Sequence, residues 1–421
     1  MHLAARRQRG DVMWTQRSSA TIGRRTVALS NTLALREALF GGTKKTMSKI
    51  ERILIVGAGM AGLALAISLR RQGWSPDIVE RQQGWSVPGA GIYLVGNAMR
   101  ALGSLGLADE VLRDGSAIRT QTILDDRGRQ LAVIDTASVW EKSGPCVGIR
   151  RADLQKSLVN ALGPADIQFS TTVSALDTHG AAAAVQFSNG TERMYDLVIG
   201  ADGVRSSIRT LAFGGVQPRF CGQVGWRFLV QCPPSVSGWT LFAGHRGVFL
   251  FIPVGQGQAY CYADAAVTEP LDDPSEGRLE RLRSRFASYA TPVPEALAEL
   301  RTSEQIHFGA IEDILQEPWG TDKVLLIGDA AHATSPNMAS GAAMAFEDAL
   351  VLSKLIVSGQ DVAKVTNEYT NQRISRIRWL HEQTRKRDAI RNLPPVVRNL
   401  MTRFLAKSVY RANYAPLVED L

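Results

Sequence analysis

The sequence predicts an α/β fold with a Rossmann-like parallel sheet, an inserted antiparallel sheet and C-terminal helices. Three observations predict it. An apolar strand runs into a glycine-rich turn and a helix near residue 57, two further strands end in acidic residues at positions 202 and 329, and a segment rich in aromatic residues and turns lies between those acids. Strand–turn–helix units build parallel sheets, whereas short strands joined by proline and glycine turns build antiparallel ones.

The composition is that of an ordinary folded chain. Of the 421 residues, 45% are apolar and 21% charged, which is typical of globular proteins, and the length allows about two or three domains. No apolar run approaches the ~18–20 residues of a membrane-spanning helix, so we expect no transmembrane segment. We expect no metal site and a reduced, cytoplasmic protein, because no C-x-x-C pair occurs among the four cysteines, Cys146, Cys221, Cys232 and Cys261.

The net charge of +8 is concentrated at the N-terminus. Residues 1–46 hold nine Arg or Lys against two acids, so they carry +7 and the remainder carries +1. A nearly neutral body gives no indication of nucleic-acid binding. The segment is similar in composition to a transit peptide, or it is an upstream extension before Met47. Either reading predicts a mobile basic extension over residues 1–47.

The first glycine-rich turn has the spacing of a dinucleotide-binding loop. The apolar strand Ile53–Val56 leads into it. Gly57 permits the tight turn, Gly59 lets a pyrophosphate approach the backbone, and Gly62 lets helix and strand pack closely. The next strand ends on Glu80, whose carboxylate is spaced to bind a ribose. The predicted cofactor-binding residues here are Gly57, Gly59, Met60, Ala61, Gly62, Glu80 and Arg81.

Two later strands end in acids that a simple nicotinamide domain does not need. Asp196–Ser206 contains Asp202, and Val324–His332 contains Asp329. The three motifs in this order resemble the class A flavoprotein monooxygenases, the fold of p-hydroxybenzoate hydroxylase, from Lys49 to about Arg387. The resemblance implies a glutathione-reductase-type domain that holds one FAD non-covalently.

The resemblance also implies roles in flavin binding. Asp329 would bind the ribityl hydroxyls, Asp202 would lie near the pyrophosphate, and the helix that begins near Gly341 would point backbone N–H groups at the flavin pyrimidine carbonyl. Further implied contacts come from the stretch around residues 91–92 and from an R-x-x-L segment. The residues implied in this way are Gly91, Ile92, Arg151, Asp202, Asp329, Pro336, Gly341 and Ala342.

One segment departs from the family pattern. Members often have P-x-x-G-Q-G where this chain has Pro336-Asn337-Met338-Ala339-Ser340-Gly341. Ala339 places a Cβ where glycine would permit a positive φ, and Ser340 lacks the reach of glutamine. The departure leaves two alternatives to hydroxylation open, namely a flavin dehydrogenase or reductase of the same fold and a flavin-binding protein that shelters an intermediate without turnover.

The segment before residue 318 predicts the substrate side. Its strand-like runs are Val224–Val230, Trp239–Phe242, Gly247–Pro253 and Gln258–Tyr262. Its aromatic residues either line a ligand pocket over the flavin or form the core face of the sheet. Arg227 within an apolar strand either binds a substrate oxygen or forms a salt bridge to the FAD domain. The predicted pocket residues, partly by similarity to pyridine-ring oxygenases, are Tyr93, Arg227, Phe249 and Met338. No catalytic acid or base is assigned; we expect His245 at an exposed hairpin tip and a structural His332.

These assignments divide the chain. We expect the FAD-binding domain at 48–119, 145–215 and 318–395, the β-sheet substrate domain at 120–144 and 216–317, and a helical tail at 396–421. The apolar face of the tail either covers the core, which base rates favour, or touches a membrane. The basic run Arg373–Arg391 predicts a solvated helix face.

The resemblance extends to reaction and substrate. It implies that NADH or NADPH, bound transiently because no second Rossmann fingerprint is present, reduces FAD. Oxygen then forms a flavin C4a-hydroperoxide that hydroxylates a small electron-rich aromatic such as a quinolone, pyridine or phenol. The chain also resembles the alkylquinolone 3-monooxygenases, in Trp226-Arg227, residues 341–345 and the C-terminal Gln-Arg-rich helix, which adds a lipophilic bicyclic substrate to the options. We expect a monomer or homodimer.

Overall fold

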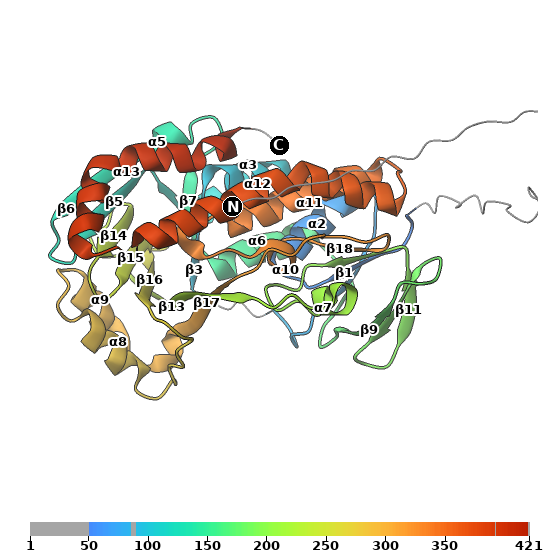
Figure 1. Cartoon of the computed structure of the whole chain (residues 1–421), viewed down its shortest axis with the longest axis horizontal. Coiled ribbons are helices and arrows are strands. Elements are labelled where there is room, and N and C mark those ends of the chain that lie inside the picture. The colour runs from blue at the N-terminus through green and yellow to red at the C-terminus, as the bar shows by residue number, and fades with distance from the viewer. Residues whose placement is uncertain (1–49, 86–89, 392, 420–421) are drawn as a thin grey trace, which may run out of the picture. The chain divides into compact units, whose positions relative to one another are not determined.

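The computed structural model describes residues 50–85, 90–391 and 393–419, all in a unit that runs from Ser48 to Leu421. The predicted extension at residues 1–47 lies outside the described residues. The expected α/β fold is confirmed: parallel and antiparallel sheets alternate with helices along the chain (Figure 1). Within the described ranges, no helix is both long and apolar enough to cross a membrane.

A parallel sheet forms the centre of the predicted flavin domain. Its order is β18 (Val324–Leu326), β12 (Leu197–Gly200), β1 (Ile53–Val56), β2 (Asp77–Val79) and β8 (Ile167–Gln168). β1 and β12 are fully buried, as expected for apolar strands covered on both faces. Because the carboxyl ends of parallel strands share one edge, the turns after β1, β12 and β18 come together there.

Helices and smaller sheets surround this centre. α2 (Met60–Arg70) packs between α6 (Arg151–Leu162) and α11 (Gly341–Val357). The two three-stranded sheets are β11 (Glu192–Tyr195), β10 (Ala183–Phe187) and β9 (Val173–Asp177), and β3 (Gly91–Leu94), β7 (Cys146–Arg150) and β4 (Ser116–Ile118). The shorter helices are α3 (Gly96–Ser104), α4 (Ala108–Asp114), α5 (Thr136–Val139), α7 (Ser207–Phe213), α10 (Asp329–His332), η1 (Ser303–Gln305) and η2 (Pro336–Met338).

A seven-stranded sheet forms the other half. Its order is β17 (His307–Asp313), β13 (Arg219–Gln231), β16 (Gln258–Ala266), β15 (Val248–Pro253), β14 (Trp239–Ala243), β5 (Thr120–Asp125) and β6 (Gln130–Asp135). All neighbouring pairs are antiparallel except β14 and β5, which run parallel. The parallel pair joins two stretches of chain that lie more than a hundred residues apart in the sequence.

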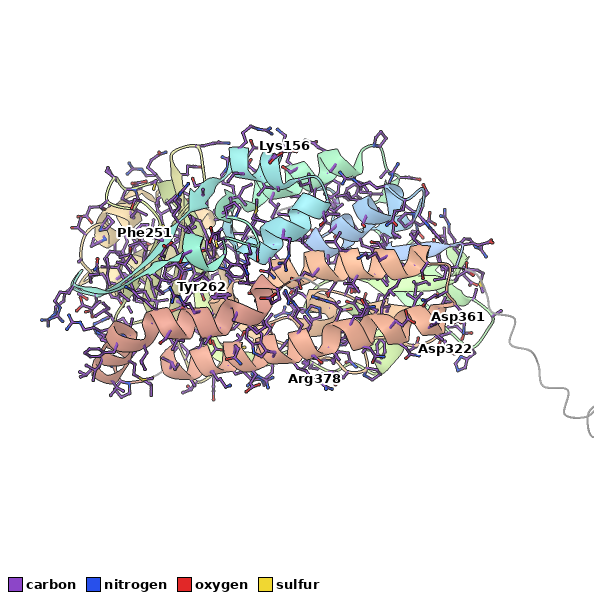
Figure 2. All side chains as sticks on the ribbon, turned by 90° about the horizontal axis from the view of Figure 1, so that it is seen from above. Lys156, Phe251, Tyr262, Asp322, Asp361 and Arg378 are labelled. Atoms are coloured by element: carbon purple, nitrogen blue, oxygen red, sulfur yellow. The ribbon has the colours of Figure 1, made fainter. Side chains whose placement is uncertain are left out.

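The two faces of this sheet have different neighbours. Successive strand residues point to opposite faces, so Trp226 and Phe228 join a core with α8 (Arg278–Phe286) and α9 (Val293–Glu299). Tyr260 and Tyr262 instead join the core of the flavin domain. Phe251 and Tyr262, both labelled in Figure 2, belong to these two different cores. These aromatic residues therefore form core faces on both sides of the sheet, and the pocket role stays a prediction.

The two C-terminal helices contradict two expectations. In α12 (Val362–Arg391), Arg373 is fully buried against Glu347 and Asp348 of α11, so the solvated-face prediction is wrong at this residue. In α13 (Pro395–Val418), Tyr410 and Leu417 are buried. The apolar side chains earlier in α13 are exposed, so the expectation that they cover the core is wrong for Val397, Leu400, Phe404 and Leu405.

Candidate active site

The three glycines of the loop differ in how much space surrounds their Cβ positions. Gly57 has φ +107°, and a Cβ there would lie 2.5 Å from the carbonyl oxygen of Ala201. A Cβ on Gly62 would lie 2.0 Å from the carbonyl oxygen of Gly57. A Cβ on Gly59, by contrast, would have no atom within 4 Å. The first two glycines are therefore required by the protein itself, and open space at the third fits a bound pyrophosphate.

Two helices begin at the site without a side-chain cap. α2 starts at Met60 and Ala61 after Gly59, and α11 starts at Gly341 and Ala342, with no acidic residue in either first turn. The backbone N–H groups of a first turn have no partner within the helix, and the helix dipole makes that end positive. These ends can therefore bind the phosphate and the flavin carbonyl of FAD.

Glu80 fixes the loop to the end of β2. Its carboxylate accepts hydrogen bonds from the backbone N–H groups of Ala58 and Gln82, both at 2.9 Å. A carboxylate has about four lone-pair sites, so it retains capacity for a ribose hydroxyl. Arg81, beside it, is exposed.

The Asp202 carboxylate already accepts several hydrogen bonds at the start of α7. It accepts hydrogen bonds from the Ser207 backbone N–H at 2.7 Å, from the Ser207 hydroxyl at 2.9 Å and from the Ser206 hydroxyl at 2.5 Å. It therefore orders the turn after β12. The next residue, Gly203, has φ +83° and open space around its Cβ position, which leaves backbone, rather than this carboxylate, available to a ligand.

Asp329 is the acid that has capacity for a ligand. Its side chain is exposed and has no hydrogen-bond partner within the described residues, yet surrounding protein desolvates it and raises its pKa. It faces Gly341, where a Cβ would lie 3.9 Å from Asp329 Oδ1. Burial lowers the pKa of Arg151, and the charges of Tyr260 and Asp329 counteract that effect. An acceptor beside a free helix N-terminus fits the ribityl chain and ring of FAD.

A buried ion network supports this turn. Asp348 accepts from the Gly328 backbone N–H at 2.9 Å, lies 2.7 Å from His332 Nε2 and pairs with Arg373 at 2.8 Å. Burial opposes its ionisation, but His332 and Arg373 hold the Asp348 pKa well below its usual range. His332 therefore has a structural contact, as expected. The sequence did not reveal the network, because an Arg in a basic helix gives no signal of its buried partner.

Arg227 projects from the face of β13 that meets the flavin domain. Its guanidinium carbon lies 5.5 Å from the ring centroid of Tyr262. Burial raises the pKa of Tyr260, and the charge of Arg227 partly offsets this. Within the described ranges Arg227 forms no ion pair, so the salt bridge to the FAD domain, one of the two alternatives for this residue, is not found. The charges of Arg227 and Asp329 both act on Arg151, so the structure gathers these three residues.

The remaining predicted pocket residues are Tyr93, Met338 and Phe249, and each is buried among partners of its own. Tyr93 is buried, its hydroxyl accepts from Gln121 Nε2 at 3.3 Å, and burial raises its pKa. Met338 is buried, and its carbonyl oxygen accepts from the Tyr414 hydroxyl at 3.0 Å. Phe249 packs on Phe286 of α8, with ring centroids 5.4 Å apart. The structure therefore does not bring Phe249 together with Arg227, because it lies on the opposite face of the sheet.

The other residues predicted around the flavin are found on β3 and in the segment before α11. Gly91 lies against Tyr260, where a Cβ would come within 2.5 Å of Tyr260 Cβ, and Ile92 beside it is half-buried. Pro336 is exposed at the start of η2. Ala339 has φ +48°, as its place in the glycine pattern predicted. The left-handed conformation persists despite the Cβ.

Sequence reasoning missed a polar strip beside Arg227. The buried atoms Tyr262 OH, Asp264 Oδ2 and Gln223 Nε2 have no hydrogen-bond partner within the described residues. They lie on the same sheet face as Arg227, because Tyr262 pairs with Arg227 and Asp264 with Gly225. Strict alternation along β13 and β16 could have identified this face.

The glycine loop, the two free helix ends and the unpartnered Asp329 suit the two ends of one extended dinucleotide. Such a site on this fold defines an FAD-binding enzyme. The aromatic sheet beside it is where a ring substrate would meet the flavin.

Comparison with known proteins agrees. The family model described as an FAD binding domain matches residues 51–384, so the chain belongs to this family. It is 30% identical over 345 residues to the FAD-dependent urate hydroxylase of Klebsiella pneumoniae subsp. pneumoniae, covering 80% of this chain and 89% of the relative. It is also 30% identical over 337 residues to the 2-heptyl-3-hydroxy-4(1H)-quinolone synthase of Pseudomonas aeruginosa, covering 79% and 87%.

A solved structure extends the comparison. Klebsiella pneumoniae HpxO in complex with FAD and uric acid matches with a TM-score of 0.76 and 27% identity, covering 88% of this chain and 93% of that chain. The chain is an FAD-dependent aromatic monooxygenase of class A that uses NAD(P)H, as the sequence resemblance implied. This outcome favours hydroxylation over the dehydrogenase and the sheltering protein that the sequence left open.

Proposed function

We propose that this monooxygenase hydroxylates a fused-ring, nitrogen-containing aromatic that binds as an anion, with Arg227 opposite its charged oxygen. The observation that carries the proposal is the half-buried Arg227, which has no carboxylate partner within the described residues. Because Arg227 is half-buried, a ligand can reach it, and an anionic ligand would supply the charged partner that the described residues do not. The names of two relatives, a urate hydroxylase and a quinolone synthase, support a fused heterocycle.

The chain's own residues would act as follows. FAD, when bound, supplies an electrophilic oxygen after reduction by NAD(P)H and reaction with O2. Arg227 holds the substrate anion, whose charge enriches the ring carbon next to it in electrons. The buried rings of Tyr260 and Tyr262, on the same sheet face as Arg227, exclude water, which strengthens that electrostatic contact. The N-terminus of α11 stabilises negative charge on the flavin ring, and Asp329 orients its ribityl chain.

The test measures NADH and NADPH oxidation, hydrogen peroxide and product mass across hydroxyquinolones, purines, hydroxypyridines and hydroxybenzoates. We expect a fused heterocycle to accelerate oxidation, to yield little peroxide and to gain one oxygen atom. Arg227→Gln should lower kcat/KM for that compound roughly ten- to a hundredfold, as for the loss of a charged hydrogen bond, and Arg227→Lys should lose less. Arg113→Gln, at an exposed position on α4, is the control.

Other results would contradict this proposal. A preference for single-ring benzoates would remove the fused-ring assignment. Unchanged kcat/KM in Arg227→Gln would remove the role of Arg227. We also propose a monomer or homodimer in the cytoplasm, which sedimentation and cell fractionation can check.

A further inference from the structure

The first half of α13 presents large apolar side chains to solvent. We define the α13 face by its exposed apolar residues, Val396, Val397, Leu400, Phe404 and Leu405. Val396 is 81% exposed, Phe404 73% and Leu400 59%. Isolated exposed apolar residues are normal on protein surfaces, but a contiguous group on one element marks an interaction site.

The spacing of these residues makes a stripe. Val396, Leu400 and Phe404 are four residues apart, so they lie above one another on one side of the helix. The inward side is made instead by Arg398 and Tyr410, which are buried. Arg398 donates hydrogen bonds to the carbonyl oxygens of Ala243 and Gly244 at 3.0 and 3.1 Å. The helix is therefore anchored through polar contacts, and its apolar stripe is left without a partner among the described residues.

The exposed charged residues of α13 are all basic. Arg403, Lys407 and Arg411 are exposed on α13, and no Asp or Glu occurs between Asp388 and Glu419. A twofold contact between two copies would bring the same face together and oppose like charges. Charge complementarity therefore favours an anionic partner over a second copy.

We propose that the α13 face binds the surface of an anionic membrane. An amphipathic helix with aromatic and aliphatic residues flanked by cations lies in the plane of the interface, with its apolar side chains at the boundary of headgroups and acyl chains. Each nearby Arg or Lys adds attraction to anionic lipid. The contact is peripheral.

A hollow at the start of α13 extends this surface. It has a volume of about 280 Å³ and is lined by Pro394 and Pro395, by the turn between β14 and β15, and by Arg391 and Arg398. Arg391 Nη1 has no hydrogen-bond partner within the described residues. Arg391 is paired with Asp264, and Arg398 donates to backbone carbonyl oxygens, so the hollow enlarges the surface beside the apolar stripe without adding a free cation. The inference concerns localisation at a surface and does not depend on the proposed substrate.

The experiment sediments the full-length, FAD-loaded protein with vesicles of phosphatidylcholine alone and of phosphatidylcholine with phosphatidylglycerol. We expect binding to the anionic vesicles only, weakened by salt. The double variant L400S/F404S should weaken partitioning by more than about tenfold. R403Q and K407Q should each weaken it by about fivefold. L112S/L271S, which changes exposed leucines elsewhere, is the matched control.

Several outcomes would overturn the proposal. They are no sedimentation with either vesicle, equal binding to neutral and anionic vesicles, and full binding by L400S/F404S. Light scattering, which measures the mass of the particle in solution, distinguishes a second copy or a protein partner on the α13 face from a membrane. A dimer that L400S/F404S dissociates, without vesicle binding, would assign the face to a second copy, and binding to an acidic protein alone would assign it to a protein partner. Flavin absorbance and circular dichroism verify that each variant is folded.

Discussion

Replacing Arg373 with methionine should cost about 3–5 kcal/mol of unfolding free energy, because it leaves a buried charge without its partner. Arg373 and Asp348 are both fully buried, and their side chains meet at 2.8 Å. Glu347, the second partner of Arg373, keeps Arg376 at 2.9 Å. The uncompensated group is therefore Asp348, whose remaining hydrogen-bond partners among the described residues are His332 and the Gly328 backbone N–H.

The assay is urea unfolding of the wild type and of R373M, followed by circular dichroism. R378M is the matched control, because Arg378 lies on the same helix and pairs with the half-exposed Glu317. An exposed pair of this kind contributes about 0–1 kcal/mol. The double variant R373M/D348N should be more stable than R373M, since it removes the orphaned charge. Equal losses in R373M and R378M, or no recovery in the double variant, would refute the reasoning.

Two further predictions concern the glycine loop and pH. Gly62→Ala should prevent normal folding, because its Cβ would lie 2.0 Å from a backbone oxygen. Gly59→Ala should fold normally and bind FAD about tenfold or more weakly. Thermal melts and flavin titration distinguish the two variants, and the reverse pattern would contradict the assignment. Burial lowers the pKa of His381 to about 4, so the unfolded chain binds a proton from about pH 6.5 downward that the folded chain refuses. The free energy of unfolding therefore carries no penalty from His381 above pH 6.5 and should fall by roughly 2–3 kcal/mol as the pH drops to 4. The urea midpoint of His381→Gln should vary less with pH over that range. The same dependence of the midpoint on pH in the variant and the wild type would disprove the role of His381.

The sequence predicted the parts that a short motif determines. β1 has the expected bounds, and β2 ends at Val79, directly before the expected terminal Glu80, because a strand, a glycine turn and a terminal acid specify them locally. Ala339 takes the positive φ that its place in a glycine pattern indicated. Its conformation follows from the turn, which the surrounding chain enforces on whichever residue is present.

Burial could not be predicted where it depends on distant partners. Arg373 looks like its solvated neighbours in the sequence, and only the packing of α12 on α11 places it between two acids. Phe249 belongs to an alternating strand, but alternation does not say which face meets α8. The exposure of the apolar stripe on α13 could not be predicted for the same reason, because an amphipathic pattern identifies an apolar side without identifying what covers it.

The strand order of the parallel sheet bears on how the enzyme matures. β1, at residues 53–56, pairs with β12 at 197–200, which in turn pairs with β18 at 324–326. During synthesis the glycine loop and its neighbour β2 thus leave the ribosome long before β12 and β18 exist, whereas β14, β15 and β16 follow one another closely and can form at once. Distant pairings are slow to form. The flavin pocket should therefore be completed last, and nascent chains shorter than about residue 341 lack the second helix end needed to retain the cofactor.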